Sequence, residues 1–143
     1  MAEPTARCQE CGAPSVDGMV CWEVLGNILA WEWNDPALQS MHFLTVASYN
    51  LQHPAQFTDE AIAGLRAAVA DYLDHGLSAQ AIRKQVGRIY EGRKRVLKPN
   101  AERTPVLRPW SQTINAVYQN NQPTRAAERV REWATSIRQE FGA

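Results

Sequence analysis

Apolar residues recur at three- and four-residue steps along most of this chain, and this spacing constrains the fold more than any other feature. The last segment shows it best, because one helix face would carry Ala126, Val130, Trp133, Ile137 and Phe141. Strand-like alternation of apolar and polar residues is nearly absent. The chain is therefore predicted to be all-α, a compact bundle of about six helices.

Capping residues and prolines mark where the predicted helices begin and end. Asp35 followed by Pro36 suits a helix start, and Pro54 ends that helix because the residue before a proline leaves the α region. Thr58 and Gly76 are predicted to cap the next helix. The predicted helices span about 18–33, 36–51, 58–76, 78–92, 110–117 and 126–141, and a basic, proline-containing connection occupies residues 93–109.

The composition is that of one soluble globular domain, residues 1–143. These 143 residues, 45% of them hydrophobic, are enough to bury a core without disulfides. No apolar run reaches the length of about 18 residues that a membrane span needs, so we expect no membrane association. The first residues carry neither the basic nor the apolar part of a secretory signal, which predicts a cytoplasmic protein.

Metal-binding chemistry is concentrated near the N-terminus, in Cys8-x-x-Cys11-Gly12 and the later Cys21. A C-x-x-C turn brings two thiolates to one side of a tight loop, where both reach a Zn²⁺ ion at about 2.3 Å. The odd number of cysteines, three, disfavours a set of disulfides. Residues 1–21 are predicted to form a zinc knuckle that leads into the first helix, with redox-active or inert thiols as the alternatives.

Three thiolates require a fourth ligand, and the candidates are His42, His53 and His75. If the first two helices form a hairpin that turns near Asn34, Cys21 lies close to the end of the second helix. His53 lies just past that end, whereas His42 lies about 9 Å away in the other direction. His75 falls in the last turn of its helix, where a histidine commonly interacts with terminal carbonyls. His53 is therefore predicted to complete the site.

His42 needs another role, because two histidines eleven residues apart on one helix cannot bind the same metal ion. One interpretation is a buried histidine that is hydrogen-bonded to a helix carbonyl, to Glu23 or to Glu32. The other is a pocket containing His42, Tyr49, Glu32 and Glu23, in which His42 acts as a general base or binds a second metal ion. These residue types are too common to identify a reaction.

Charge is distributed unevenly along the chain although the net charge is zero. Residues 1–82 carry 2 basic and 10 acidic groups, net −8, and residues 83–108 carry 9 and 2, net +7. Clustered lysines and arginines suit phosphate contacts, but the acidic part offers internal partners and the pI is about 6.8, so nucleic acid is not the expected partner. Arg95 and Arg108 are candidates for holding a small phosphorylated or carboxylate ligand.

Several of these motifs together resemble a known family. They are Cys8-x-x-Cys11-Gly12, Cys21, the run from His42 to Pro54, Arg95-Val96, and Arg108-Pro109-Trp110-x-x-Thr113-Ile114. Over most of its length the chain is similar to a family of small bacterial proteins, domain of unknown function 5946, and the Leu-Gln-His-Pro run is the most specific part. The resemblance implies a shared fold with a Cys/His metal site, and it brings no substrate or catalytic residue.

Three classes of function remain open on these observations. The leading one is a zinc-stabilised small bacterial helical protein that acts as a binding or interaction module for a protein partner or a small anionic ligand. The second is a metal-dependent enzyme with its pocket around His42, Tyr49 and Glu32. The third is a nucleic-acid-associated factor that uses the basic segment 83–108. The sequence does not decide whether the protein is an enzyme.

Overall fold

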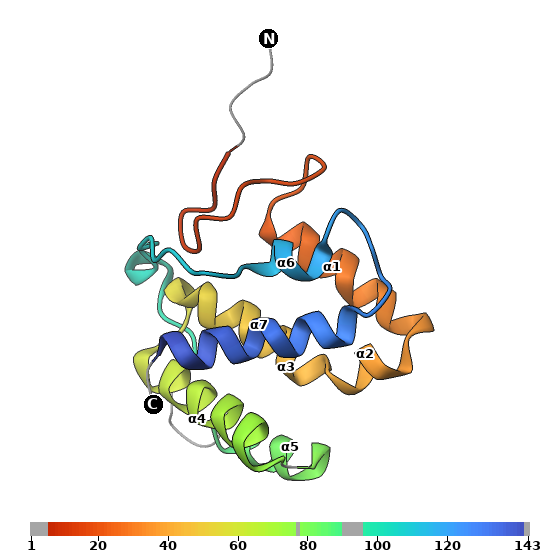
Figure 1. Cartoon of the computed structure of the whole chain (residues 1–143). Coiled ribbons are helices and arrows are strands. Elements are labelled where there is room, and N and C mark those ends of the chain that lie inside the picture. Colours follow the sequence, from red (N-terminus) through yellow and green to blue (C-terminus); the bar gives the residue numbers. More distant parts are fainter. Residues whose placement is uncertain (1–5, 77, 90–95, 142–143) are drawn as a thin grey trace.

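A computed structural model describes residues 6–76, 78–89 and 96–141 and confirms the all-α class (Figure 1). The helices of this part of the chain are α1 (Cys21–Trp31), α2 (Pro36–Ser40), α3 (His42–Gln52), α4 (Asp59–His75), α5 (Ala79–Ile89), α6 (Ile114–Tyr118) and α7 (Ala126–Glu140). Short 3₁₀ turns η1 (Glu32–Asn34), η2 (Pro54–Gln56) and η3 (Asn100–Glu102) lie between them. None of the described helices is long and apolar enough to span a bilayer.

Helix α7 runs through the middle of the molecule and packs against α3, α4 and α6 (Figure 1). Helix α1 packs against α6 on one side of this centre, and α5 packs against α4 on the other. The predicted apolar stripe of the last helix forms much of the core, because its residues Ala126, Val130, Trp133 and Ile137 are fully buried. Removing such side chains from water supplies most of the driving force for folding.

The predicted capping residues are confirmed where the structure describes them. The side chain of Asp35 accepts a hydrogen bond from the Leu38 backbone N–H at 3.1 Å, which satisfies one free donor at the start of α2. Thr58 does the same for α4 by accepting from the Ala61 N–H at 3.2 Å. Gly76 ends α4 in the left-handed region, at φ 60°, as a C-terminal glycine commonly does.

The predicted helix at 36–51 is corrected, because it consists of two helices, α2 and α3, that break at Met41. The Met41 N–H donates to the Leu38 carbonyl at 2.9 Å, which is 3₁₀ rather than α geometry. Just before the break, the Ser40 hydroxyl donates to the Ala37 carbonyl at 2.6 Å, a side-chain bond that competes with helical pairing. His42 is thus the first residue of α3 and not an interior residue of a longer helix.

Other predicted boundaries shift by a few residues. Helix α1 begins at Cys21 instead of about residue 18, because Asp17 and Gly18 form a tight turn with φ of 51° and 76°. Trp110 precedes α6, which starts at Ile114. The predicted stop at Gly92 and residues 93–95 of the basic connection lie outside the described residues.

Candidate metal centre

The knuckle before α1 is a tight turn held by backbone hydrogen bonds. The Cys8 N–H donates to the Ala13 carbonyl at 2.8 Å, and the Gly12 N–H donates to the Cys8 carbonyl at 3.0 Å. Gly12 has a φ of +79°, which favours glycine, and an added Cβ there would lie 3.3 Å from the Leu107 side chain. This turn places the two cysteines of the C-x-x-C sequence on one side of the loop.

The four residues predicted as metal ligands lie together. Cys8 and Cys11 come from the knuckle, Cys21 is the first residue of α1, and His53 caps the end of α3. Their ligand atoms all lie within 4.8 Å of one another, and the sulfurs of Cys11 and Cys21 are 3.6 Å apart. Cys8 is half-buried and the other three residues are buried. The cluster can therefore bind a metal ion with four protein ligands.

The imidazole of His53 is oriented for metal binding. Its Nδ1 lies 2.7 Å from the carbonyl oxygen of Tyr49, one helical turn earlier, so Nδ1 carries the proton and donates. The Tyr49 ring stacks on the His53 ring, with centroids 4.1 Å apart. The other nitrogen, Nε2, is buried and has no hydrogen-bond partner among the described residues. A buried nitrogen of this kind has an unused lone pair, and a metal ion would satisfy it.

Glu10 attaches the knuckle to two other segments. Its side chain accepts a hydrogen bond from the Ala55 N–H at 2.8 Å, in the turn that follows His53. Its backbone carbonyl accepts from the Arg108 N–H at 2.9 Å. Earlier in the same connection, the Lys98 N–H donates to the carbonyl of Gln56 at 2.8 Å. The metal cluster is therefore held at a junction of the knuckle, the end of α3 and the connection before α6.

The thiols and the imidazole perturb one another's protonation. The hydrogen bond with Cys21, together with nearby His53, lowers the pKa of Cys11 to about 4 against the opposing effect of burial. The same hydrogen bond and burial raise the pKa of Cys21. Burial lowers the pKa of His53, but its interactions with Cys11 and with the Tyr49 carbonyl outweigh that effect, so the net shift is upward. Metal binding requires deprotonated thiols and a free imidazole nitrogen, so a cation bound among these groups would displace their protons.

The structure does not assemble the predicted pocket of His42, Tyr49, Glu32 and Glu23. His42 pairs with Glu32, at 2.9 Å, but its side chain is 57% exposed, so the interpretation as a buried histidine is wrong. Tyr49 packs on His53 and lines a separate hollow of about 240 Å³ at the metal cluster. The Glu23 side chain accepts from the Val20 N–H at the start of α1. His42 and Tyr49 lie on one face of α3, but they are two helical turns apart and therefore contact different residues.

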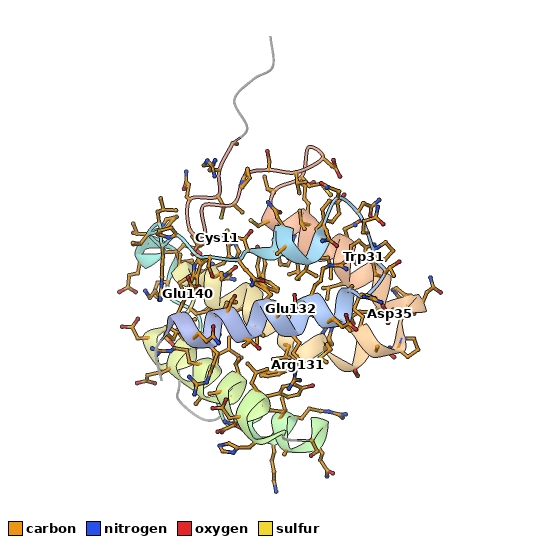
Figure 2. The ribbon with its side chains drawn as sticks, viewed as in Figure 1. Cys11, Trp31, Asp35, Arg131, Glu132 and Glu140 are labelled. Atoms are coloured by element: carbon orange, nitrogen blue, oxygen red, sulfur yellow. The ribbon has the colours of Figure 1, made fainter. Side chains whose placement is uncertain are left out.

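The two ends of α3 lie in different surroundings, because His53 after its end joins the metal cluster and His42 at its start pairs with Glu32. Figure 2 shows Cys11 and Glu140 toward one end, and Trp31 and Asp35 toward the other. The hairpin used to choose His53 also needs correction, because α1 packs against α6 and α3 packs against α7. Helices α1 and α3 meet where Trp22 lies against Tyr49, with ring centroids 6.1 Å apart. This meeting point is enough to bring Cys21 to His53.

Arg108 has structural contacts at the end of α7. Its guanidinium donates to the carbonyl of Glu140 at 3.0 Å and lies 4.2 Å from the centre of the Trp110 ring. Arg95, its predicted partner in anion binding, lies outside the described residues. The described part of the basic segment 83–108 makes no ion pair with the acidic residues of the described chain. The expected internal pairing of this segment is therefore not seen in the part that is described.

Sequence reasoning missed Gln52, the residue before His53. It is 1% exposed and bridges two elements: its amide donates to the Gln112 carbonyl at 2.7 Å, and its carbonyl accepts from the Trp133 indole at 3.1 Å. It also missed Glu10, which lies between two cysteines. The signal for Gln52 was its place in the Leu-Gln-His-Pro run, and Glu10 gave no signal because its partner is 45 residues away.

The fold and the cluster define an all-α protein with a site of three cysteines and one histidine that can hold a metal ion. The chain belongs to the family described as Family of unknown function (DUF5946), whose model matches residues 6–142. No curated protein and no solved structure matches the chain.

Proposed function

We propose that this protein is a zinc-stabilised helical binding or interaction module, in which the metal has a structural role. One observation carries the proposal: four protein ligand atoms, three of them on buried residues, lie within 4.8 Å of one another. Four protein ligands complete a tetrahedral zinc site and leave no position for a reacting water. A catalytic zinc site typically has three protein ligands and a water.

The chemistry of the donors favours zinc over other metals. Thiolate sulfur and imidazole nitrogen are the ligands that structural zinc sites use, whereas calcium and magnesium prefer oxygen. The unpartnered Nε2 of His53 supplies the nitrogen, and the hydrogen bond from its Nδ1 to the Tyr49 carbonyl sets the tautomer. Reduced thiolates persist in reducing compartments, so we also propose a cytoplasmic protein, and the family resemblance suggests a bacterial one.

The bound metal would stabilise a segment that has little secondary structure. Residues 6–20 contain no helix, and two isolated bridges, Arg7 with Pro14 and Val16 with Met19, supply their β-type backbone pairing. Zinc held by Cys8, Cys11 and Cys21 would fix this segment to α1, and His53 would fix it to α3. Because such a site does not exist in the unfolded chain, metal binding contributes directly to folding.

The test is metal content together with thermal stability. Protein purified in zinc-containing medium should hold about one zinc per chain by elemental analysis. Cys11→Ser should lose most of the metal and melt at a lower temperature, because a hydroxyl is a poor substitute for a thiolate ligand. Gln9→Ser, on an exposed residue of the same turn, is the matched control and should keep the zinc content and the melting temperature of the unaltered protein. Full zinc occupancy in Cys11→Ser, or no zinc in the unaltered protein, would contradict the proposal.

A further inference from the structure

A cavity of about 780 Å³ lies away from the metal cluster and is lined by residues of α2, α3, α4 and α5. Cavities of about 300–1,000 Å³ are typical of sites for small molecules. The described residues of its lining that matter here are His42, Phe43 and Val46 of α3, Tyr72 of α4, and Ile82 and Arg83 of α5. The cavity includes His42, which lies eleven residues before the metal-site histidine.

The walls of this cavity are largely apolar. The rings of Phe43 and Tyr72 lie with centroids 5.8 Å apart, one from α3 and the other from α4. Val46 and Ala47 continue the apolar surface along α3, and Ile82 adds to it from α5. An apolar body placed here would be removed from water against these side chains, which favours binding in proportion to the area buried.

His42 adds an oriented polar group at the start of α3. Its Nδ1 lies 2.9 and 3.0 Å from the two carboxylate oxygens of Glu32, so Nδ1 donates and Nε2 remains for another partner. The Glu32 side chain is only 12% exposed, which holds the carboxylate, and with it the imidazole, in place. Nε2 of this histidine can interact with an acidic group of a bound molecule by sharing one proton with it, because neither a neutral Nε2 nor a carboxylate has a hydrogen of its own to donate.

The charge of the cavity lining indicates that the polar group of a bound molecule would be anionic. Arg83 of α5 lines the cavity, and no aspartate or glutamate is among the described lining residues. Arg83 also has no acidic partner, because the ion pairs in the described part of the chain are His42 with Glu32 and Arg138 with Asp74. An unpaired guanidinium beside an apolar wall is complementary to a molecule with an apolar body and an anionic end, and guanidinium matches carboxylate geometry.

We propose that this cavity binds a small apolar carboxylic acid from solution, with its hydrocarbon part against Phe43 and Tyr72 and its carboxylate directed at His42 and Arg83. The proposal goes beyond the metal centre, because none of the four candidate metal ligands is among the described lining residues, and it does not require the metal. It names the class of ligand that the proposed binding module would take, while the metal keeps its structural role.

The experiment is titration of the zinc-containing full-length protein with decanoate and naphthoate, followed by calorimetry and by protein NMR shifts. The corresponding alcohols, which keep the apolar body and lack the charge, are titrated in parallel. At least one acid should bind at one site per chain and at least about tenfold more tightly than its alcohol, the size expected for one charge-assisted hydrogen bond. Shifts should centre on residues of the cavity lining. Equal binding of acid and alcohol, or no saturable binding of either acid, would overturn the proposal.

Variants separate the site from non-specific association. Arg83→Gln should weaken binding of the acid by about tenfold and leave the alcohol unchanged. Lys84→Gln makes the same charge change on the next residue of α5, outside the lining, and should have no effect. Val46→Trp should block both probes by filling the cavity. Zinc content is measured on every sample, so failure of the carboxylate site is distinguished from failure of the metal site. An equal loss from Arg83→Gln and Lys84→Gln would overturn the proposal.

Discussion

Replacing Gln52 by leucine is a stringent test of how the end of α3 is held. Gln52 is 1% exposed and Trp133 is fully buried, and the indole N–H of Trp133 donates to the Gln52 side chain at 3.1 Å. Gln52→Leu keeps a similar volume and leaves that N–H without a partner, at a cost of about 1–3 kcal/mol. The Gln112 carbonyl loses its donor too, but Gln112 is half-buried and water can replace part of that bond.

The expected total is a loss of about 2–3 kcal/mol in the free energy of unfolding. For a chain of this size each kcal/mol corresponds to about 2–4 °C, so the melting temperature should fall by about 4–12 °C. Urea denaturation with saturating zinc measures the free energy, because the metal then occupies its site in every sample. Gln139→Leu, on an exposed residue of α7, is the matched control and should change stability by less than about 0.5 kcal/mol.

A double-mutant cycle isolates the hydrogen bond itself. Trp133→Phe removes the donor, and in the protein that also carries Gln52→Leu neither partner remains to be left unsatisfied. The two changes should therefore be non-additive by about 1–2 kcal/mol. Unchanged stability of Gln52→Leu, or strict additivity in the cycle, would refute the reasoning that this buried amide links α3 to α7.

Two further predictions concern the metal ligand and the basic segment. His53→Ala should weaken zinc retention during dialysis against a chelator. His42→Ala should leave zinc retention unchanged, because the His42 side chain pairs with Glu32 and does not join the cluster. The reverse result would mean that another histidine completes the site. Labelled single-stranded RNA and duplex DNA should bind weakly at low and moderate salt, and micromolar binding that falls steeply with salt and is lost on replacing residues 93–95 would favour a nucleic-acid function instead.

Local signals in the sequence were sufficient to predict most of the helices. Thr58 and Gly76 predicted the bounds of α4 because a cap depends on the residue and its immediate neighbours. The stripe of α7 was equally clear, since a buried helix face repeats within one segment. The break at Met41 had no such signal, because apolar spacing continues through it and methionine is a good helix former.

The candidate metal site was predicted to the extent that spacing and helix geometry allow. The cysteine spacing is a local pattern. His53 was chosen from a hairpin that the structure does not form, and the choice was right because α1 and α3 still meet at Trp22 and Tyr49. The prediction of a pocket shared by His42 and Tyr49 was wrong, because a shared helix face does not imply a short distance along the axis. Tyr49 is seven residues after His42 and lies about 10 Å farther along the helix axis. Contacts such as Glu10 with Ala55 join distant segments, which one sequence does not reveal.

X-ray absorption at the zinc edge of the purified, zinc-containing protein tests the central claim most directly, because it reports the atoms bound to the metal. The structure brings together three sulfur donors and one nitrogen donor, from Cys8, Cys11, Cys21 and His53. The spectrum should therefore fit three sulfurs at about 2.3 Å and one nitrogen at about 2.0–2.1 Å, with the histidine scattering lost in His53→Ala. A shell with an oxygen from water in the unaltered protein, or with fewer than three sulfurs, would contradict a structural site of four protein ligands.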